Sequence, residues 1–172
     1  NARFNYAYRA EATASTFNEV LDEYLVGGAA FDAGKAYMAA EGGVYRLYDG
    51  NTNAVAMMHK NRLFAPVSAL GNLSGASVEL AKDGKSATWS IGDKVIVFTA
   101  DSTEVKVGID TCIIPVAPFM ENGVLYVPLN AAAYVAELQY YANGNSAIIS
   151  SKAETPEGED GRRLFEALKR AF

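Results

Sequence analysis

His59 and Cys112 are the only histidine and cysteine of the chain, so metal or nucleophilic chemistry would first be assigned to them. A redox copper site needs several nitrogen or sulfur ligands in a fixed geometry, and a structural zinc site usually needs four. One imidazole and one thiol complete neither. No Gly-x-Ser-x-Gly or Ser-x-x-Lys motif supplies a nucleophile for His59 to activate. We therefore predict no metal site and no cofactor, and we assign no catalytic residue.

Carboxylates leave one enzymatic alternative open. A glycosidase needs only two of them, about 5–9 Å apart, and sequence does not reveal that spacing. Residues 49–53 alternate oxygen ligands as calcium loops do, but Ala54 and Lys60 stand where such a loop needs its glycine and its bidentate glutamate. A plain hairpin turn is favoured there. The acidic run Glu154–Asp160 is typical of a solvated linker.

Aromatic side chains give the chain its one suggestion of a binding function. Large rigid rings stack on sugar faces and are enriched at protein interfaces. The chain has ten tyrosines and one tryptophan. The ligand-binding candidates are Trp89, Tyr126, Tyr134, Tyr140 and Tyr141, with Tyr45 and Tyr48 as further possibilities. Most of these rings alternate with apolar strand residues, so packing in the core is the competing interpretation of each.

Charge and hydropathy narrow the classes of partner. The 172 residues carry a net charge of −5, with no basic stripe to neutralise phosphates, which argues against nucleic acid. Half of the residues are hydrophobic, which predicts a folded domain, yet no apolar run has the roughly 18–20 residues of a membrane-spanning helix. We therefore expect neither nucleic-acid binding nor membrane insertion, and the sequence leaves the oligomeric state open.

Hydrophobic periodicity predicts a strand and a helix near the N-terminus, followed by mostly β structure. Residues 4–10 alternate as a strand does. A capping box formed by Thr16 and Glu19 begins a helix that Gly27 and Gly28 end. Further strands are predicted at 44–48, 54–59, 63–65, 78–80, 87–91, 94–99, 104–107, 111–116, 124–127, 139–142 and 147–150, with helices at 67–73 and 129–138. A final amphipathic helix would contain Leu164, Phe165, Leu168 and Phe172.

Two stretches of the chain repeat one order of elements. Leu63–Pro66 matches Leu125–Pro128, and Ser86–Ser90 matches Ser146–Ser150. This predicts an internal repeat, in which each copy buries part of its apolar face against the other. The expected fold class is α+β, with two tandem β-β-α-β-β units that form small antiparallel sheets with packed helices, plus an N-terminal helix. The expected divisions are an extension at 1–43, units at 44–92 and 93–150, and an acidic linker with a short helix at 151–172.

The repeated segments resemble a known family. Asn122–Asn130, and less closely Asn61–Val67, are similar to the Gly-Arg-x-hydrophobic-Val-Pro-Leu-Arg segment of the stalk-type domain related to the N-terminal domain of bacterial copper amine oxidases. Gly75–Val78 fits the exit of that family's helix. The resemblance covers about residues 44–150. It departs from the pattern where Ser68 and Asn130 replace the arginine after Pro-Leu.

The resemblance implies an accessory role, because the catalytic machinery of the oxidase lies in its other domains. The family recurs in secreted and surface proteins of Gram-positive bacteria, which implies an extracellular location. The resulting hypothesis is a non-catalytic spacer, adhesion or binding module, with cell-wall polysaccharide or another surface protein as partner. The alternative is a small glycosidase-like hydrolase with paired carboxylates.

Overall fold

The computed structural model describes residues 23–41, 43–48, 50, 53–152, 161, 162, 165 and 166. Residues 23–25 are helical, as are 161, 162, 165 and 166. The expected strand at 4–10, the capping box of Thr16 and Glu19, the acidic run and most of the turn at 49–51 lie outside the described residues. So do three of the four apolar residues of the expected C-terminal helix.

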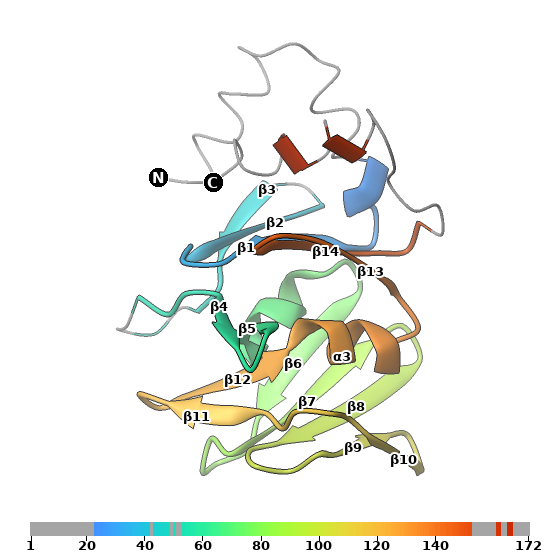
Figure 1. Cartoon of the computed structure of the whole chain (residues 1–172). Coiled ribbons are helices and arrows are strands. Elements are labelled where there is room, and N and C mark those ends of the chain that lie inside the picture. Colours follow the sequence, from blue (N-terminus) through green and yellow to red (C-terminus); the bar gives the residue numbers. More distant parts are fainter. Residues whose placement is uncertain are drawn as a thin grey trace.

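Strands dominate the described part of the chain (Figure 1). They are β1 Ala29–Asp32, β2 Tyr37–Ala40, β3 Gly43–Arg46, β4 Met57–His59, β5 Arg62–Pro66, β6 Ala76–Leu80, β7 Ser86–Ile91, β8 Lys94–Thr99, β9 Glu104–Val107, β10 Asp110–Ile113, β11 Phe119–Glu121, β12 Val124–Pro128, β13 Gln139–Asn143 and β14 Ser146–Ser150. The helical elements are the 3₁₀ helix η1 Val67–Asn72 and the α-helix α3 Leu129–Val135.

The expected α+β fold class is wrong: the part of the chain that the structure describes is mainly β and forms three sheets. Two tandem units, each with its own sheet and packed helix, do not form. The strands that precede the helical element of each unit, β5 and β12, join instead into one four-stranded sheet in the order β11-β12-β5-β4, in which β11 was not predicted. The hairpin β6-β7 belongs to a five-stranded sheet in the order β10-β9-β8-β7-β6, whereas β13-β14 belongs to another in the order β13-β14-β1-β2-β3. A free strand edge can pair with a strand from elsewhere in the chain, and in this fold β5 with β12 and β14 with β1 pair across the expected boundaries.

The three sheets are stacked around a shared core. In Figure 1 the sheet of β1–β3, β13 and β14 lies above, the sheet of β6–β10 lies below, and η1 and α3 lie between them. One buried cluster draws side chains from all three sheets, including Phe31, Leu63, Trp89, Phe98 and Leu125. A smaller cluster around Phe64 and Tyr126 covers the central sheet. The large cluster is therefore shared by all three sheets, whereas the smaller one belongs to the central sheet.

The central sheet is shaped by two tight hairpins. Residues Lys60 and Asn61 have φ of 50° and 63°, and Asn122 and Gly123 have φ of 52° and 79°. Two successive residues with positive φ are what a type I′ two-residue hairpin turn requires, and the twist of that turn matches the twist of the strands. Asparagine and glycine tolerate this conformation best. Each hairpin leads into a strand that ends in proline and continues as a helical element.

The two five-stranded sheets are built alike, although β1–β3 come from the N-terminal part of the chain. Each sheet adds a three-strand meander to a hairpin that follows a helical element. Three backbone hydrogen bonds of one sheet have counterparts in the other, and their donors are spaced identically along the chain. Around the first sheet, the amides of Ala33, Gly34 and Leu47 donate to the carbonyls of Asn145, Ala56 and Ala36, respectively. Around the second sheet, the amides of Ala100, Asp101 and Ile114 donate to the carbonyls of Lys85, Pro118 and Thr103. The strands β1–β3 therefore take the place in one sheet that β8–β10 take in the other.

Glycine permits β1 to begin close against β14. A Cβ atom added at Gly28 would lie 2.2 Å from the Ile149 carbonyl oxygen, which is well inside van der Waals contact. Phe31 pairs with Ala147 farther along the same ladder, and both side chains are buried. The N-terminal strand is thus inserted into the structure beside β14.

Candidate functional site

Three of the five sequence-predicted binding residues are buried, and two of these, Trp89 and Tyr126, belong to the core clusters. The Trp89 ring is fully buried, stacks near Phe98 with a centroid distance of 6.3 Å, and donates its indole N–H to the Leu70 carbonyl at 3.0 Å. Tyr126 is buried in the central sheet and stacks on Phe119 at 5.2 Å. Burial raises the pKa of the Tyr126 phenol, and the nearby charge of Glu121 raises it further. Both rings are enclosed by packing.

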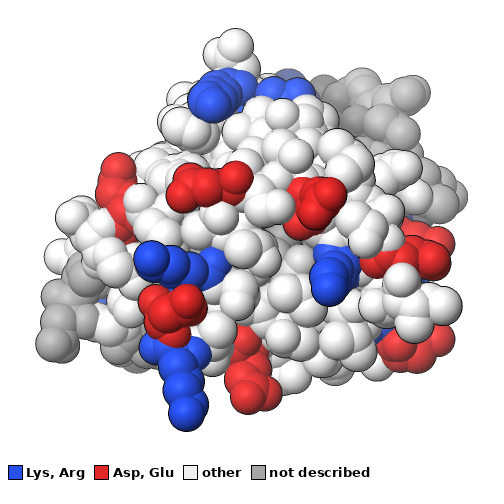
Figure 2. Space-filling view, turned by 90° about the horizontal axis from the view of Figure 1, so that it is seen from below, with Lys and Arg blue, Asp and Glu red and all other residues white. Residues whose placement is uncertain are grey.

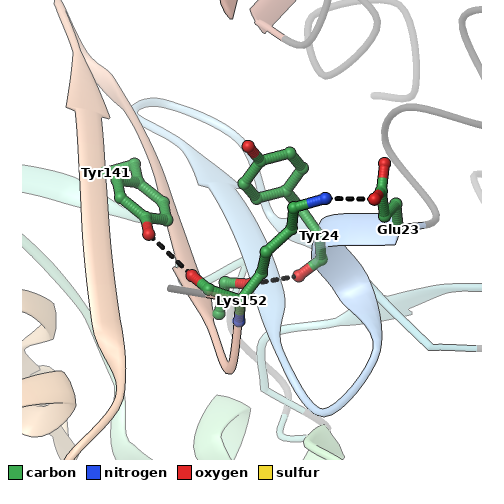
Figure 3. A network of polar contacts seen from close by, with 5 residues as sticks. Glu23, Tyr24, Tyr141 and Lys152 are labelled. Atoms are coloured by element: carbon green, nitrogen blue, oxygen red, sulfur yellow. Dashed lines mark hydrogen bonds and ion pairs between the residues drawn. The ribbon is translucent and has the colours of Figure 1, made fainter. Parts of the chain in front are cut away.

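Tyr141 belongs to a network of polar contacts beside β14, which also contains Glu23, Tyr24, Ser150 and Lys152 (Figure 3). Its hydroxyl donates to the Lys152 carbonyl at 2.6 Å, and its ring meets that of Tyr24 edge to face at 5.9 Å. The Lys152 ammonium pairs with the Glu23 carboxylate and lies 5.0 Å from the centre of the Tyr24 ring. The Ser150 hydroxyl donates to the Tyr24 carbonyl at 2.8 Å. This network of polar contacts holds the residues before β1 against those at the end of β14 and just after it.

Tyr140, the next residue along β13, is half-buried against the large core cluster. Burial raises the pKa of its phenol from 10.0 to about 12. The folded state therefore keeps a proton that the unfolded chain loses near pH 10. Stability that is present below pH 10 should be lost as the pH rises toward 12.

Tyr140→Phe should flatten this alkaline decline. We expect the wild type to lose on the order of 1–2 kcal/mol more than the variant between pH 9 and 12, because one pKa unit corresponds to about 1.4 kcal/mol and the ring is only partly shielded. Urea unfolding followed by circular dichroism at each pH would measure the difference. Parallel curves for the two proteins would contradict it.

Tyr134 is the one predicted ring that projects fully from the surface. It lies on α3 and is 73% exposed. Together with Asn130 and Ala131 on the same helix, it lines an open groove of about 440 Å³. The opposite wall is formed by Ile113, at the end of β10, and the following Ile114 and Pro115. Figure 1 shows the connection from β10 to β11 passing beneath α3.

The groove has the composition of a recognition site. Its walls are mainly aliphatic, and Ile113 is 67% exposed beside it. Asn130 and Tyr134 add polar groups at one side. Ligand sites commonly combine apolar walls with a few placed polar groups, within volumes of about 300–1,000 Å³. A second hollow, between Tyr48 and Leu80, has a volume of only about 20 Å³, which is room for one water molecule.

Sequence reasoning missed the aliphatic wall of this groove. The sequence predicted one strand over residues 111–116, whereas β10 ends at Ile113, and of Ile113, Ile114 and Pro115 only Ile114 is buried. The available signal was the proline itself, because proline ends strand pairing and is confined to edges and strand ends. The five predicted rings are not gathered on one surface, since Tyr134 lies apart from the enclosed Trp89, Tyr126 and Tyr141.

The only imidazole and the only thiol lie in different sheets. His59, in β4, packs on Phe119 and Phe64 with centroid distances of 4.5 and 5.2 Å. Cys112, in β10, packs against the large core cluster. Among the described residues no three His, Cys, Asp or Glu side chains gather where they could hold a metal ion. The described residues therefore do not supply the several nitrogen or sulfur ligands that a copper site needs.

Charge is mixed on the face shown in Figure 2, which looks at the molecule from below. Lysine and arginine side chains alternate there with aspartate and glutamate, and no basic patch forms on this face. Lys94 pairs with Glu137 at 3.2 Å. In the part of the chain that the structure describes, no helix is both long and apolar enough to cross a membrane.

Comparison with known proteins identifies the family. Residues 48–150 match the model of the copper amine oxidase N-terminal domain. Neither the comparison with curated proteins nor that with solved structures gave a match. In other proteins the matched domain is a non-catalytic module. The match includes β4 to β14 and both walls of the groove, and it extends over more than half of the sequence. The chain therefore belongs to the copper amine oxidase N-terminal domain family.

Proposed function

We propose that this chain is a non-catalytic accessory module of a secreted or cell-surface protein, and that it binds its partner through the groove between β10 and α3. The observation that carries the proposal is the exposed apolar wall pair of Ile113 and Tyr134 around about 440 Å³ of open volume. Large exposed apolar residues that surround a hollow usually mark a binding surface. The family supports a non-catalytic role, because the matched domain is non-catalytic in other proteins.

The hydrolase alternative gains no support from the two hollows. A glycosidase needs two carboxylates that face each other across a cleft. Neither the groove at Tyr134 nor the small hollow at Tyr48 is lined by an aspartate or a glutamate. Wall polysaccharide and surface proteins are therefore candidate ligands of the groove rather than substrates.

Tyr134→Ala should weaken partner binding without destabilising the fold. The ring is mostly exposed, so its loss should change the unfolding free energy by less than about 0.5 kcal/mol. An aromatic anchor beside a groove commonly contributes about 2 kcal/mol or more to binding, which corresponds to a loss of more than about tenfold in affinity. Co-sedimentation with purified Gram-positive cell walls, both intact and stripped of protein, would measure the binding.

Val26→Ala is the matched control, because Val26 is also an exposed apolar residue, at 56%, and does not line the groove. It should bind the walls as the wild type does. Equal sedimentation of the wild type and Tyr134→Ala would remove the groove from the proposal. A wild type that stays in the supernatant with both wall preparations would favour the spacer role.

A further inference from the structure

The fold contains a closed counterpart of the groove, at the junction of β3 and η1. There the Ser68 hydroxyl donates to the Leu47 carbonyl at 2.6 Å. The Asn72 amide donates to the Arg46 carbonyl at 3.5 Å. Two polar side chains of the helical element thus hold the end of the neighbouring strand against it.

The same four positions in the other half of the fold line the open groove. α3 corresponds to η1, so Asn130 and Tyr134 stand where Ser68 and Asn72 stand in η1. The end of β10 corresponds to the end of β3, so Ile113 and Ile114 stand where Arg46 and Leu47 stand. Asn130 Oδ1 accepts instead from the Ala131 amide at 2.8 Å. Within the described residues neither Asn130 nor Tyr134 bonds to the strand end. This junction is therefore open because Asn130 and Tyr134 do not make the bonds that Ser68 and Asn72 make at the closed junction.

The edge of β10 adds unpaired backbone groups along the groove. β10 is the outer strand of its sheet, and the Ile114 amide donates to the Thr103 carbonyl on the β9 side at 2.8 Å. Backbone groups of alternate residues point to opposite sides of a strand, so those of Thr111 and Ile113 point away from β9. No hydrogen bond among the described residues engages these outward groups. Such an edge is a template for another strand.

The chemistry of the groove selects among possible occupants. No residue of the lining carries a formal charge at neutral pH, and α3 has no acidic residue in its first turn or basic residue in its last. This favours an uncharged ligand. A glycan site generally offers several rings, whereas Tyr134 is the one aromatic side chain of the lining.

Area argues against a second copy of the chain as the occupant. The exposed apolar residues at this edge are Ile109, Ile113 and Tyr134. Together they offer only a few hundred Å², at about 150–250 Å² for the aromatic ring, and a stable interface needs about 800 Å² from each partner. A short extended segment of another protein needs much less area, because pairing with the strand edge contributes its main-chain hydrogen bonds.

We propose that the groove binds an extended, uncharged polypeptide segment, which adds to the outward edge of β10 and packs alternate apolar side chains against Ile113 and Tyr134. This inference rests on the proposed function, because it names the ligand class of the same groove. The bonds it invokes are those of a β-ladder to the Thr111 and Ile113 backbone.

The test is a titration of the full, ¹⁵N-labelled chain with a blocked hexapeptide of alternating serine and valine, followed by amide chemical shifts. The expected result is a saturable shift of the Thr111 and Ile113 amides and of the α3 amides around Tyr134. The matched probe is the same peptide with an N-methyl group on every residue, which cannot donate to a strand edge. It should bind at least about tenfold more weakly.

A double variant that copies the closed junction is the protein-side control. Asn130→Ser combined with Tyr134→Asn should abolish the peptide-induced shifts and leave the melting temperature within about 2 °C of the wild type. The N-methyl comparison on the wild type keeps the test decisive if this variant fails to fold. Equal binding of both peptides, or shifts at another sheet edge with β10 unchanged, would overturn the inference.

Two further titrations distinguish a glycan or a second copy of the chain from a peptide as the occupant of the groove. Comparison with the wall-binding assay shows whether the proposed function itself fails. Shifts at the groove caused by a tetramer of N-acetylglucosamine, with none caused by the peptide, would assign a glycan and overturn the inference. Concentration-dependent shifts of the chain alone would assign a second copy and do the same. Tyr134-dependent wall binding without peptide binding removes only the inference. Loss of both removes the proposed function as well.

Discussion

A protein reduced to the family-matched span, residues 48–150, will not unfold cooperatively and will expose apolar surface. The truncation removes β1–β3, which are three of the five strands of the sheet that contains β14. It also removes the buried side chains of Phe31, Met38 and Leu47 from the shared core. At about 2 kcal/mol for each large buried side chain, and with β14 left at an open edge, the loss is on the order of 10 kcal/mol. Domains are stable by only about 5–15 kcal/mol.

A circular permutant provides the control for this truncation. Ala29 pairs with Ile149, so the beginning of β1 lies beside the end of β14. A chain of residues 48–152 followed by a short glycine-serine linker and residues 23–47 should regain a cooperative thermal transition. Circular dichroism and binding of a hydrophobic dye would compare the two proteins. A truncated chain that melts as sharply as the permutant would show that β1–β3 are dispensable.

Trp89→Ala should give the largest effect of any single substitution in the core. The ring is fully buried between sheet and helix and makes its own hydrogen bond to Leu70. Replacement by alanine leaves a cavity and an unpaired carbonyl, for a cost of about 3–5 kcal/mol. The melting temperature should fall by roughly 10 °C. Urea unfolding followed by circular dichroism gives the free energy directly, because the variant lacks the only tryptophan fluorophore.

Trp89→Phe separates packing from hydrogen bonding. Phenylalanine keeps most of the apolar volume but cannot donate to the Leu70 carbonyl. Its cost should be smaller than that of alanine, about 1–3 kcal/mol, because an unmet buried acceptor and a small cavity remain. A change of less than about 1 kcal/mol for Trp89→Ala would show that the core can close over the missing ring.

Local elements followed from the sequence where short-range rules act. The strands that end at Pro66 and Pro128, and the helical residues after them, lie close to where periodicity and proline predicted them. The family resemblance was also visible in residues 61–67 and 122–130, and the family match confirms it. These features depend on the alternation of apolar residues and on backbone preferences within a few positions, which a sequence displays directly.

Sheet membership depended on contacts that sequence order does not encode. The pairing of β5 with β12, and of β14 with β1, joins segments far apart in the chain, and this pairing made the expectation of two separate α+β units wrong. Free strand edges and apolar faces accept any partner of suitable register, so the energy that decides between partners comes from the whole core.

The chemical inventory of this protein was determined by its sequence alone: one histidine, one cysteine, a negative net charge and many aromatic rings. Only the tertiary structure decided which rings are enclosed. Trp89 and Tyr126 lie in the interior, whereas Tyr134 faces a groove whose other wall is Ile113. The physical reason is that alternation shows which residues share a face of a strand or helix, whereas burial depends on what the rest of the chain places against that face.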